Sequence, residues 1–182
     1  QELLNEQVEI READESQLIL MQECALNYVI ESKSELGGIL NSVIAEKENF
    51  DKEQFSPQIF FNKQLNNNQR EAVGICCDLS LDGLFHLVHG PPGTGKTTVI
   101  TELVRILVKN GHRVLVTSHT NVAVDNVLEK LVLQKQDSIT RLGNKSNVSE
   151  ELKNLISVGK NEALALKSSQ IVGATLSKVS ML

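Results

Sequence analysis

At the centre of the 182-residue chain stands the octapeptide Gly90-Pro91-Pro92-Gly93-Thr94-Gly95-Lys96-Thr97. It fits the pattern G-x-x-x-x-G-K-[ST], in which glycines let successive backbone N–H groups face one centre. A phosphate placed there receives those N–H groups together with the positive end of the following helix. We therefore expect the loop through Thr98 to bind the phosphates of a nucleotide. Lys96 and Thr97 are the catalytic candidates, because a lysine reaches the β- and γ-phosphates and a hydroxyl can bind Mg²⁺.

The sequence around this loop alternates between strand and helix signals. An amphipathic helix is expected to follow the loop, since apolar residues recur at three- and four-residue steps as far as Asn110-Gly111. Four short apolar runs predict strands at residues 84–88, 113–117, 138–142 and 170–174, and helices are expected between them, including 149–158 and 162–167. This order predicts an α/β fold with a parallel sheet.

The chain is expected to have three parts. Residues 1–50 carry apolar residues at helical spacing and are predicted to form a helical segment. Residues 51–64 are predicted to be an irregular linker, and residues 65–182 to form the α/β domain. Its first helix is expected to run to about residue 79, with Asn67 or Asn68 as N-cap.

Composition indicates a folded chain without a membrane span. Hydrophobic residues make up 41% and charged residues 23%, which argues against disorder. No apolar run approaches the roughly 18–20 residues of a membrane helix, and no secretory signal is visible. The three cysteines lack metal-ligand spacing, and the adjacent Cys76 and Cys77 are predicted to be buried, reduced thiols. We expect an intracellular protein, cytoplasmic or nuclear.

Charge is divided unevenly along the chain. Residues 1–60 hold 13 acidic and 4 basic side chains, whereas residues 61–182 hold 10 acidic and 14 basic ones. The net charge of −5 therefore conceals a C-terminal part with a net charge of +4. The acidic net charge of the whole chain argues against a nucleic-acid partner. The positive charge of residues 61–182 removes most of that objection for this part of the chain.

Two segments beside the loop narrow the class of nucleotide-binding protein. Upstream lies Leu65–Val73, which contains Gln69; a glutamine amide has the donor and acceptor that match adenine N6 and N7. An exposed helical glutamine is the alternative reading of that residue. Downstream, after the second predicted strand, lies Thr117-Ser118-His119-Thr120-Asn121-Val122-Ala123-Val124-Asp125.

With these elements the chain resembles superfamily 1B helicases, the group that includes the nonsense-mediated-decay helicase, senataxin and the replication nuclease-helicase. Leu65–Val73 is similar to the family's Q motif, Gly90–Thr98 to motif I, and Thr117–Asp125 to motif Ia. Two weaker similarities follow at residues 140–143 and 171–176, the latter resembling motif Ic. The resemblance covers about residues 61–182.

The resemblance implies a RecA-like first motor domain that binds ATP and Mg²⁺, preceded by a stalk-like helical segment. Gln69 would read adenine, and Lys96 and Thr97 would hold phosphate and Mg²⁺. Small polar side chains would face the backbone of single-stranded DNA or RNA: Ser118, Thr120, Asn121 and Thr175. The parent protein would couple ATP hydrolysis to translocation and duplex unwinding as a monomeric motor.

Several alternatives remain open at this point. No Asp-Glu pair follows Gly90, so we expect the N-terminal part of a motor whose catalytic acids, arginine finger and second domain lie elsewhere. An AAA+ type ATPase or a non-catalytic nucleotide-binding module are the rival functions. Asp125 is predicted to complement a helix N-terminus. Arg141 and Lys145 are candidates for phosphate contacts or for ordinary surface residues.

Overall fold

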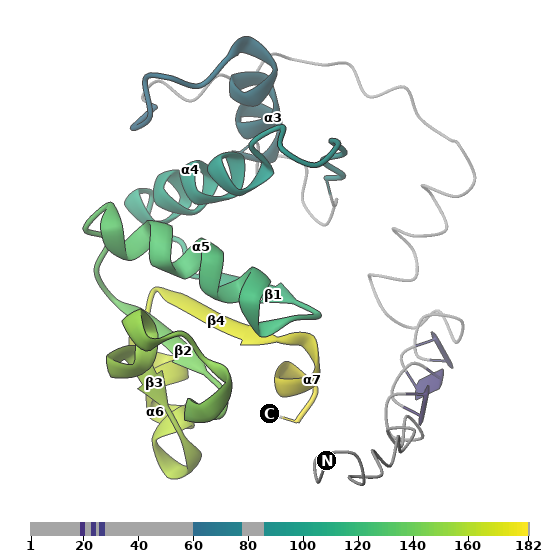
Figure 1. Ribbon diagram of the computed structural model, residues 1–182, viewed down its shortest axis with the longest axis vertical. Helices are drawn as coiled ribbons and strands as arrows, with labels where there is room; N and C mark the ends of the chain where they lie inside the picture. The colour runs from purple at the N-terminus through teal and green to yellow at the C-terminus, as the bar shows by residue number, and fades with distance from the viewer. Residues whose placement is uncertain (1–18, 21–22, 25, 28–59, 78–85, 182) are drawn as a thin grey trace, which may run out of the picture. The chain divides into compact units, whose positions relative to one another are not determined.

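A four-stranded parallel β-sheet organises the larger part of the chain in the computed structural model (Figure 1). The structure describes residues 19–20, 23–24, 26–27, 60–77 and 86–181. Its strands are β1 (Val114–Ser118), β2 (Ile139–Leu142), β3 (Ile156–Ser157) and β4 (Ile171–Thr175). They follow the order β1-β4-β2-β3, and every pair is parallel. The predicted α/β fold with a parallel sheet is therefore confirmed.

Helices cover both faces of this sheet (Figure 1). On one face lie α4 (Lys96–Lys109) and α5 (Asn121–Leu133), which share a core cluster with Ile171 of β4. The next residue of β4, Val172, points to the other face, where it packs with residues of α6 (Glu162–Ser168) and α7 (Leu176–Val179). Because successive strand residues point to opposite faces, β4 is buried on both sides.

Helix α5 packs closely against the sheet at Gly173. A Cβ atom on this glycine would lie 2.5 Å from Leu128 Cδ1 and 3.0 Å from Val124 Cγ1. Both of these side chains belong to α5 and are fully buried. The absence of a side chain at Gly173 thus sets how near α5 can come to β4.

Helix α3 (Asn67–Cys77) packs on α4 and begins with a reciprocal cap. Asn66 Oδ1 accepts from the Gln69 backbone N–H at 2.9 Å, and Gln69 Oε1 accepts from the Asn66 N–H at 3.1 Å. This is a capping box, with the N-cap and the third helical residue satisfying each other. The N-cap is therefore Asn66, and the prediction of Asn67 or Asn68 was wrong by one or two residues.

Two other sequence predictions need correction, and three short elements were not predicted. Residues 86–88, the described part of the predicted strand at 84–88, form no strand, and Leu87 is 89% exposed. The helix expected at 149–158 is a 3₁₀ helix, η2 (Glu150–Leu155), which runs directly into the unpredicted strand β3. Two further short 3₁₀ turns, η1 (Lys145–Asn147) and η3 (Gly159–Asn161), were also not predicted.

The chain divides into two units, Gln1–Lys47 and Glu48–Leu182. In the first unit, the described residues 19–20, 23–24 and 26–27 are helical, as the periodicity predicts, and the rest of the predicted helix lies outside the described residues. Among the described helices, none combines the length and apolar character that crossing a membrane would require.

Candidate functional site

The octapeptide forms an exposed loop that leads into the N-terminus of α4. Gly93 has φ +80° and Gly95 has φ +86°, so two left-handed residues curl the backbone as the sequence pattern predicts. Gly95 is also the N-cap residue of α4, and no described side chain caps this helix end. An N-terminus without a side-chain cap on a 14-residue helix is a favourable place for an anion.

Lys96 closes the loop on itself in this structure. Its ammonium donates to the carbonyl oxygens of Gly90, at 2.5 Å, and of Pro91, at 2.8 Å. The Thr94 hydroxyl also donates to the Pro91 carbonyl, at 2.8 Å. The lysine therefore lies against the loop backbone. A bound phosphate can replace these two carbonyl oxygens as its partner, because a hydrogen bond between two charged groups is stronger.

Gln69 lies on this loop. Its side-chain Nε2 donates to the Thr94 carbonyl oxygen at 3.1 Å, although the two residues are 25 positions apart. A Cβ atom on Gly95 would lie only 2.6 Å from the same Nε2. The fold thus brings the two sequence-predicted nucleotide elements, the Gln69 segment and the phosphate loop, into direct contact.

A buried glutamate that the sequence analysis did not single out holds the segment before α3. Glu102, on α4, is 2% exposed and accepts backbone N–H groups from Phe61 and Asn62. The Phe61 ring lies 4.2 Å from the Arg105 guanidinium carbon, which adds a cation–π contact to α4. These contacts fix the chain entering α3 and so position Gln69 relative to the loop. The only sequence signal for Glu102 was its place among apolar neighbours on a helix.

The cysteines of α3 are free thiols on its buried side. Cys77 is buried as predicted, whereas Cys76 is only half-buried, and both are free thiols. Burial raises the pKa of the Cys77 thiol to about 11, with smaller contributions from the neighbouring Cys76 and Glu102 charges. Burial also raises the pKa of Cys76. Both groups are therefore protonated and unreactive at neutral pH.

The residues expected to contact a nucleic-acid strand gather at the carboxyl ends of β1 and β4. Ser118 and Thr175 are register partners in this parallel pair. Thr120 caps α5 by accepting from the Ala123 N–H at 3.3 Å, and Thr175 caps α7 by accepting from the Lys178 N–H at 3.3 Å. Carboxyl ends of parallel strands are where open α/β sheets bind ligands.

Asn121 belongs to the same edge but is tied to a buried ion pair. Arg141 is 0% exposed, and its Nε donates to Asp125 Oδ1 at 2.7 Å while its Nη2 donates to Asn121 Oδ1 at 2.7 Å. Asp125 is only 5% exposed, and its other oxygen accepts from the Ser149 N–H at 3.0 Å. Arg141 is therefore neither a surface residue nor in contact with solvent, and Asp125 does not merely complement a helix end. Lys145 is exposed in η1, beyond the end of β2.

The donors for a metal ion are few. Among the residues that the structure describes, no group of three or more His, Cys, Asp and Glu side chains is placed to hold a metal. The loop fits a phosphate group, and Thr97, in the first turn of α4, offers one hydroxyl beside it. A Mg²⁺ ion here would take that hydroxyl, with phosphate oxygens and water as its remaining ligands.

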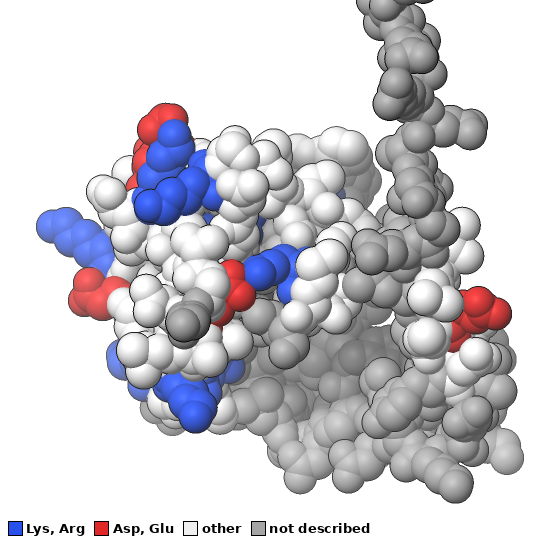
Figure 2. Space-filling view, turned by 90° about the horizontal axis from the view of Figure 1, so that it is seen from below, with Lys and Arg blue, Asp and Glu red and all other residues white. Residues whose placement is uncertain are grey.

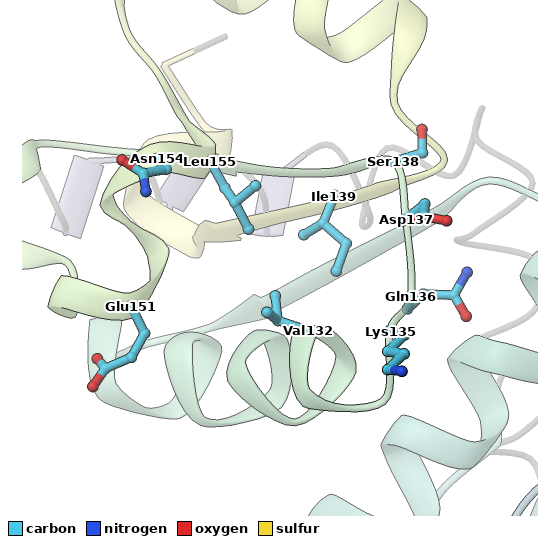
Figure 3. A pocket seen from close by; sticks show the side chains of 9 residues that line it. All are labelled: Val132, Lys135, Gln136, Asp137, Ser138, Ile139, Glu151, Asn154 and Leu155. Carbon is cyan, nitrogen blue, oxygen red and sulfur yellow. The ribbon is translucent and has the colours of Figure 1, made fainter.

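A cavity among the described residues lies away from this edge. An open pocket of about 550 Å³ is lined by the end of α5, the start of β2 and part of η2, so it faces the amino end of β2. Figure 3 shows Val132, Ile139 and Leu155 facing into it, whereas Gln136 points away. The remaining lining residues are Lys135, Asp137, Ser138, Glu151 and Asn154.

Basic side chains do not form one continuous patch on the face seen in Figure 2. Lys and Arg side chains there stand in separate groups between uncharged residues, and some lie next to Asp or Glu. An ion pair joins α7 to α6, where Lys178 Nζ lies 2.9 Å from Glu162 Oε1. This distribution agrees with the small positive charge of residues 61–182.

Comparison with known proteins identifies relatives of this site. A family model described as an AAA domain matches residues 64–163. The chain is 44% identical over 95 residues to an uncharacterized ATP-dependent helicase of Methanocaldococcus jannaschii. It is 38% identical over 99 residues to the DNA-binding protein SMUBP-2 of Rattus norvegicus. It is 50% identical over 84 residues to the DNA replication ATP-dependent helicase/nuclease DNA2 of Saccharomyces cerevisiae.

These alignments cover about half of the present chain: 51%, 54% and 46%. They cover only 14%, 10% and 5% of the three relatives, so the chain spans a small part of the length of the proteins it matches.

Proposed function

The chain belongs to the AAA-domain family, and we propose that it is the ATP-binding part of a superfamily 1 helicase. The whole protein couples ATP hydrolysis to movement along single-stranded DNA or RNA and to unwinding of the duplex. Names of three relatives include the word helicase or DNA-binding, which supports this class. The protein acts as a monomer inside the cell.

The observation that carries the proposal is the contact between Gln69 and the phosphate loop. A bare phosphate loop is common to many nucleotide-binding proteins and selects no base. Here an amide with one donor and one acceptor group lies 3.1 Å from Thr94, within the loop that would hold the phosphates. In the nucleotide complex this amide exchanges its partners in the chain for adenine N6 and N7, which gives preference for ATP.

Different groups of the loop bind different parts of the nucleotide and its metal ion. Backbone N–H groups of Gly93–Thr98 and the N-terminus of α4 hold the phosphates. Lys96 leaves the carbonyl oxygens of Gly90 and Pro91 and pairs with the β- and γ-phosphates as a point charge. Thr97 would hold a Mg²⁺ ion, which would supply positive charge to neutralise the charge that develops on the phosphates during hydrolysis.

The strand contacts are made by the carboxyl ends of β1 and β4. Ser118, Thr120, Asn121 and Thr175 offer short polar groups, which suit phosphate oxygens better than base edges. No Phe, Tyr or Trp occurs after Phe85, so this surface has no aromatic residue on which bases can stack. Binding should therefore follow the strand backbone and tolerate any base sequence.

Equilibrium titration with ATP and GTP tests the adenine-reading role. We expect tighter binding of Mg²⁺-ATP than of Mg²⁺-GTP, and we expect Gln69→Ala to remove most of the difference by weakening ATP binding alone. Gln64→Ala is the matched control, because Gln64 is an exposed glutamine of the same segment. Equal affinity of the unaltered chain for both nucleotides would refute the role of Gln69.

A further inference from the structure

The buried Arg141 side chain links α5 to the carboxyl end of β2 through polar contacts. Its guanidinium reaches Asp125 and Asn121 on α5, both at 2.7 Å, and also donates to the Leu142 carbonyl oxygen at the end of β2. Asp125 in turn accepts from the Ser149 N–H, in the segment that follows β2. One fully buried cation therefore ties the first turn of α5 to the carboxyl end of β2.

The hydrogen bond from Arg141 determines the orientation of the Asn121 side-chain amide. A guanidinium only donates hydrogen bonds, so the atom of Asn121 that faces Arg141 has to be the amide oxygen. The amide nitrogen, bonded to the same carbon, then faces away from the guanidinium with its two N–H donors. Asn121 is half-buried, whereas its neighbour Thr120, the N-cap residue of α5, is exposed.

The same turn of α5 fixes both partners of Arg141. Asn121 and Asp125 are four residues apart, so their side chains lie on one face of the helix. Thr120 begins the helix by capping the Ala123 N–H. The backbone position of Asn121 is thus set by the cap, and the rotation of its amide is set by Arg141.

We propose that Arg141 is a positioning residue for single-strand binding, which turns the Asn121 amide so that its N–H groups face a phosphate of the bound strand. This inference rests on the proposed function, because it specifies how one of the strand-contacting residues works. Arg141 itself does not touch the strand, since none of its side chain is exposed. Its charge is paired with Asp125 in this structure.

The first test uses Asn121→Asp in the full chain. The new carboxylate keeps the oxygen that accepts from Arg141 but has no N–H to offer a phosphate. We expect affinity for a fluorescent single-stranded oligothymidylate to fall about tenfold, as for loss of a hydrogen bond to a charged group. Asn126→Asp adds the same charge at an exposed position of α5 and should change the affinity less than twofold. Equal affinities of the two variants would overturn the proposal.

The second test is a double-mutant cycle between Arg141→Lys and Asn121→Ala. If Arg141 acts through Asn121, Arg141→Lys weakens strand binding when Asn121 is present and has no further effect in the Asn121→Ala chain. A purely structural role predicts effects that add, accompanied by weaker ATP binding. Should Arg141→Lys fail to fold, equal affinities of Asn121→Asp and Asn126→Asp would still overturn the proposal, because it requires Asn121 to donate to a phosphate.

Salt dependence separates positioning from direct contact. Removing a phosphate-contacting cation lowers the slope of log K against log salt by about 0.7 for a single strand. Because Asn121 is uncharged and Arg141 remains internally paired, we expect Arg141→Lys and Asn121→Ala to lower the affinity at unchanged slope. A smaller slope for Arg141→Lys would show that Arg141 contacts phosphate itself. Failure of the unaltered chain to bind the oligonucleotide would instead refute the strand-binding part of the proposed function, and this inference with it.

Discussion

Gln69 donates its side-chain amide to the Thr94 carbonyl oxygen at 3.1 Å, joining the first turn of α3 to the phosphate loop. The same side chain also accepts from the Asn66 N–H, so it completes the helix cap and holds the loop at once. A Cβ atom on Gly95 would collide with this amide, at 2.6 Å. The conformation of the loop and the position of Gln69 are therefore coupled.

This coupling predicts different outcomes for two alanine substitutions at glycines with the same φ of +86°. Gly111→Ala has open space around its new Cβ, so it should cost only the left-handed strain of about 1–2 kcal/mol. Gly95→Ala should lower the unfolding free energy further and also weaken ATP binding, because Gln69 has to move. Chemical denaturation and nucleotide titration of both variants give the comparison. Adding Gln69→Ala to Gly95→Ala should recover part of the lost stability; equal stability of the two single variants would contradict the argument.

Lys96→Ala should separate nucleotide binding from folding. The substitution removes the charge-assisted contact to phosphate, so binding of ATP is expected to weaken by about 2–3 kcal/mol in calorimetric titration. Its present partners are carbonyl oxygens of an exposed loop, so the unfolding free energy should change by only about 0.5 kcal/mol. Lys130→Ala, at an exposed lysine of α5, controls for loss of a positive charge and should leave affinity unchanged. An unfolded Lys96→Ala chain would refute this separation.

The pKa of Cys77 predicts a stability change at alkaline pH. Its thiol ionises near pH 9.0 when unperturbed and at about 11 in the folded chain, so the folded state favours the protonated form. Stability from this group is fully present below pH 9 and is lost as the pH rises towards 11. Urea unfolding across this range should show the decline, and Cys77→Ala should reduce it. At pH 8 iodoacetamide should modify the exposed Cys24 and spare Cys77; rapid alkylation of Cys77 in the folded chain would be contrary evidence.

The sequence predicted those helices and strands that depend on residues within a few positions of one another. The helix after the phosphate loop and the helix capped by Thr120 appear as expected, because periodic apolar residues and a capping residue act within a few positions. Strands β1, β2 and β4 were also predicted to within one residue at each end. Burial follows the apolar run most closely in β4, whereas β1 alternates between half-buried and exposed residues and β2 also buries the polar Thr140 and Arg141.

The features that were missed depend on distant partners. A short apolar run such as residues 86–88 becomes a strand only beside another strand, and β1 forms an edge of the sheet among the described residues. The pair of Arg141 and Asp125 spans 16 positions, and nothing local distinguishes a buried charge from a solvated one. A hint was present, however, because Arg141 stands between apolar residues of a short predicted strand, where a charged side chain needs a partner.

The close approach of α5 to β4 leads to a last prediction, Gly173→Ala. The new Cβ would lie 2.5 Å from Leu128 Cδ1, 3.0 Å from Val124 Cγ1 and 3.1 Å from Leu128 Cγ, all in a fully buried core. Since these side chains have no room to withdraw, we expect the unfolding free energy to fall by about 1–3 kcal/mol.

The position of Gly173 also links this packing to the functional edge. Moving α5 away from β4 shifts the helix that Thr120 caps relative to Thr175, which ends β4. Strand binding should therefore weaken in Gly173→Ala, whereas ATP binding should change little, because the atoms nearest to the new methyl group belong to α5 and not to α4 or the phosphate loop. Leu128→Ala, combined with Gly173→Ala, should cost less stability than the sum of the two single changes, since the smaller side chain makes room for the added methyl group. Strict additivity in denaturant unfolding would mean that the contact with Leu128 does not limit how closely α5 packs on the sheet.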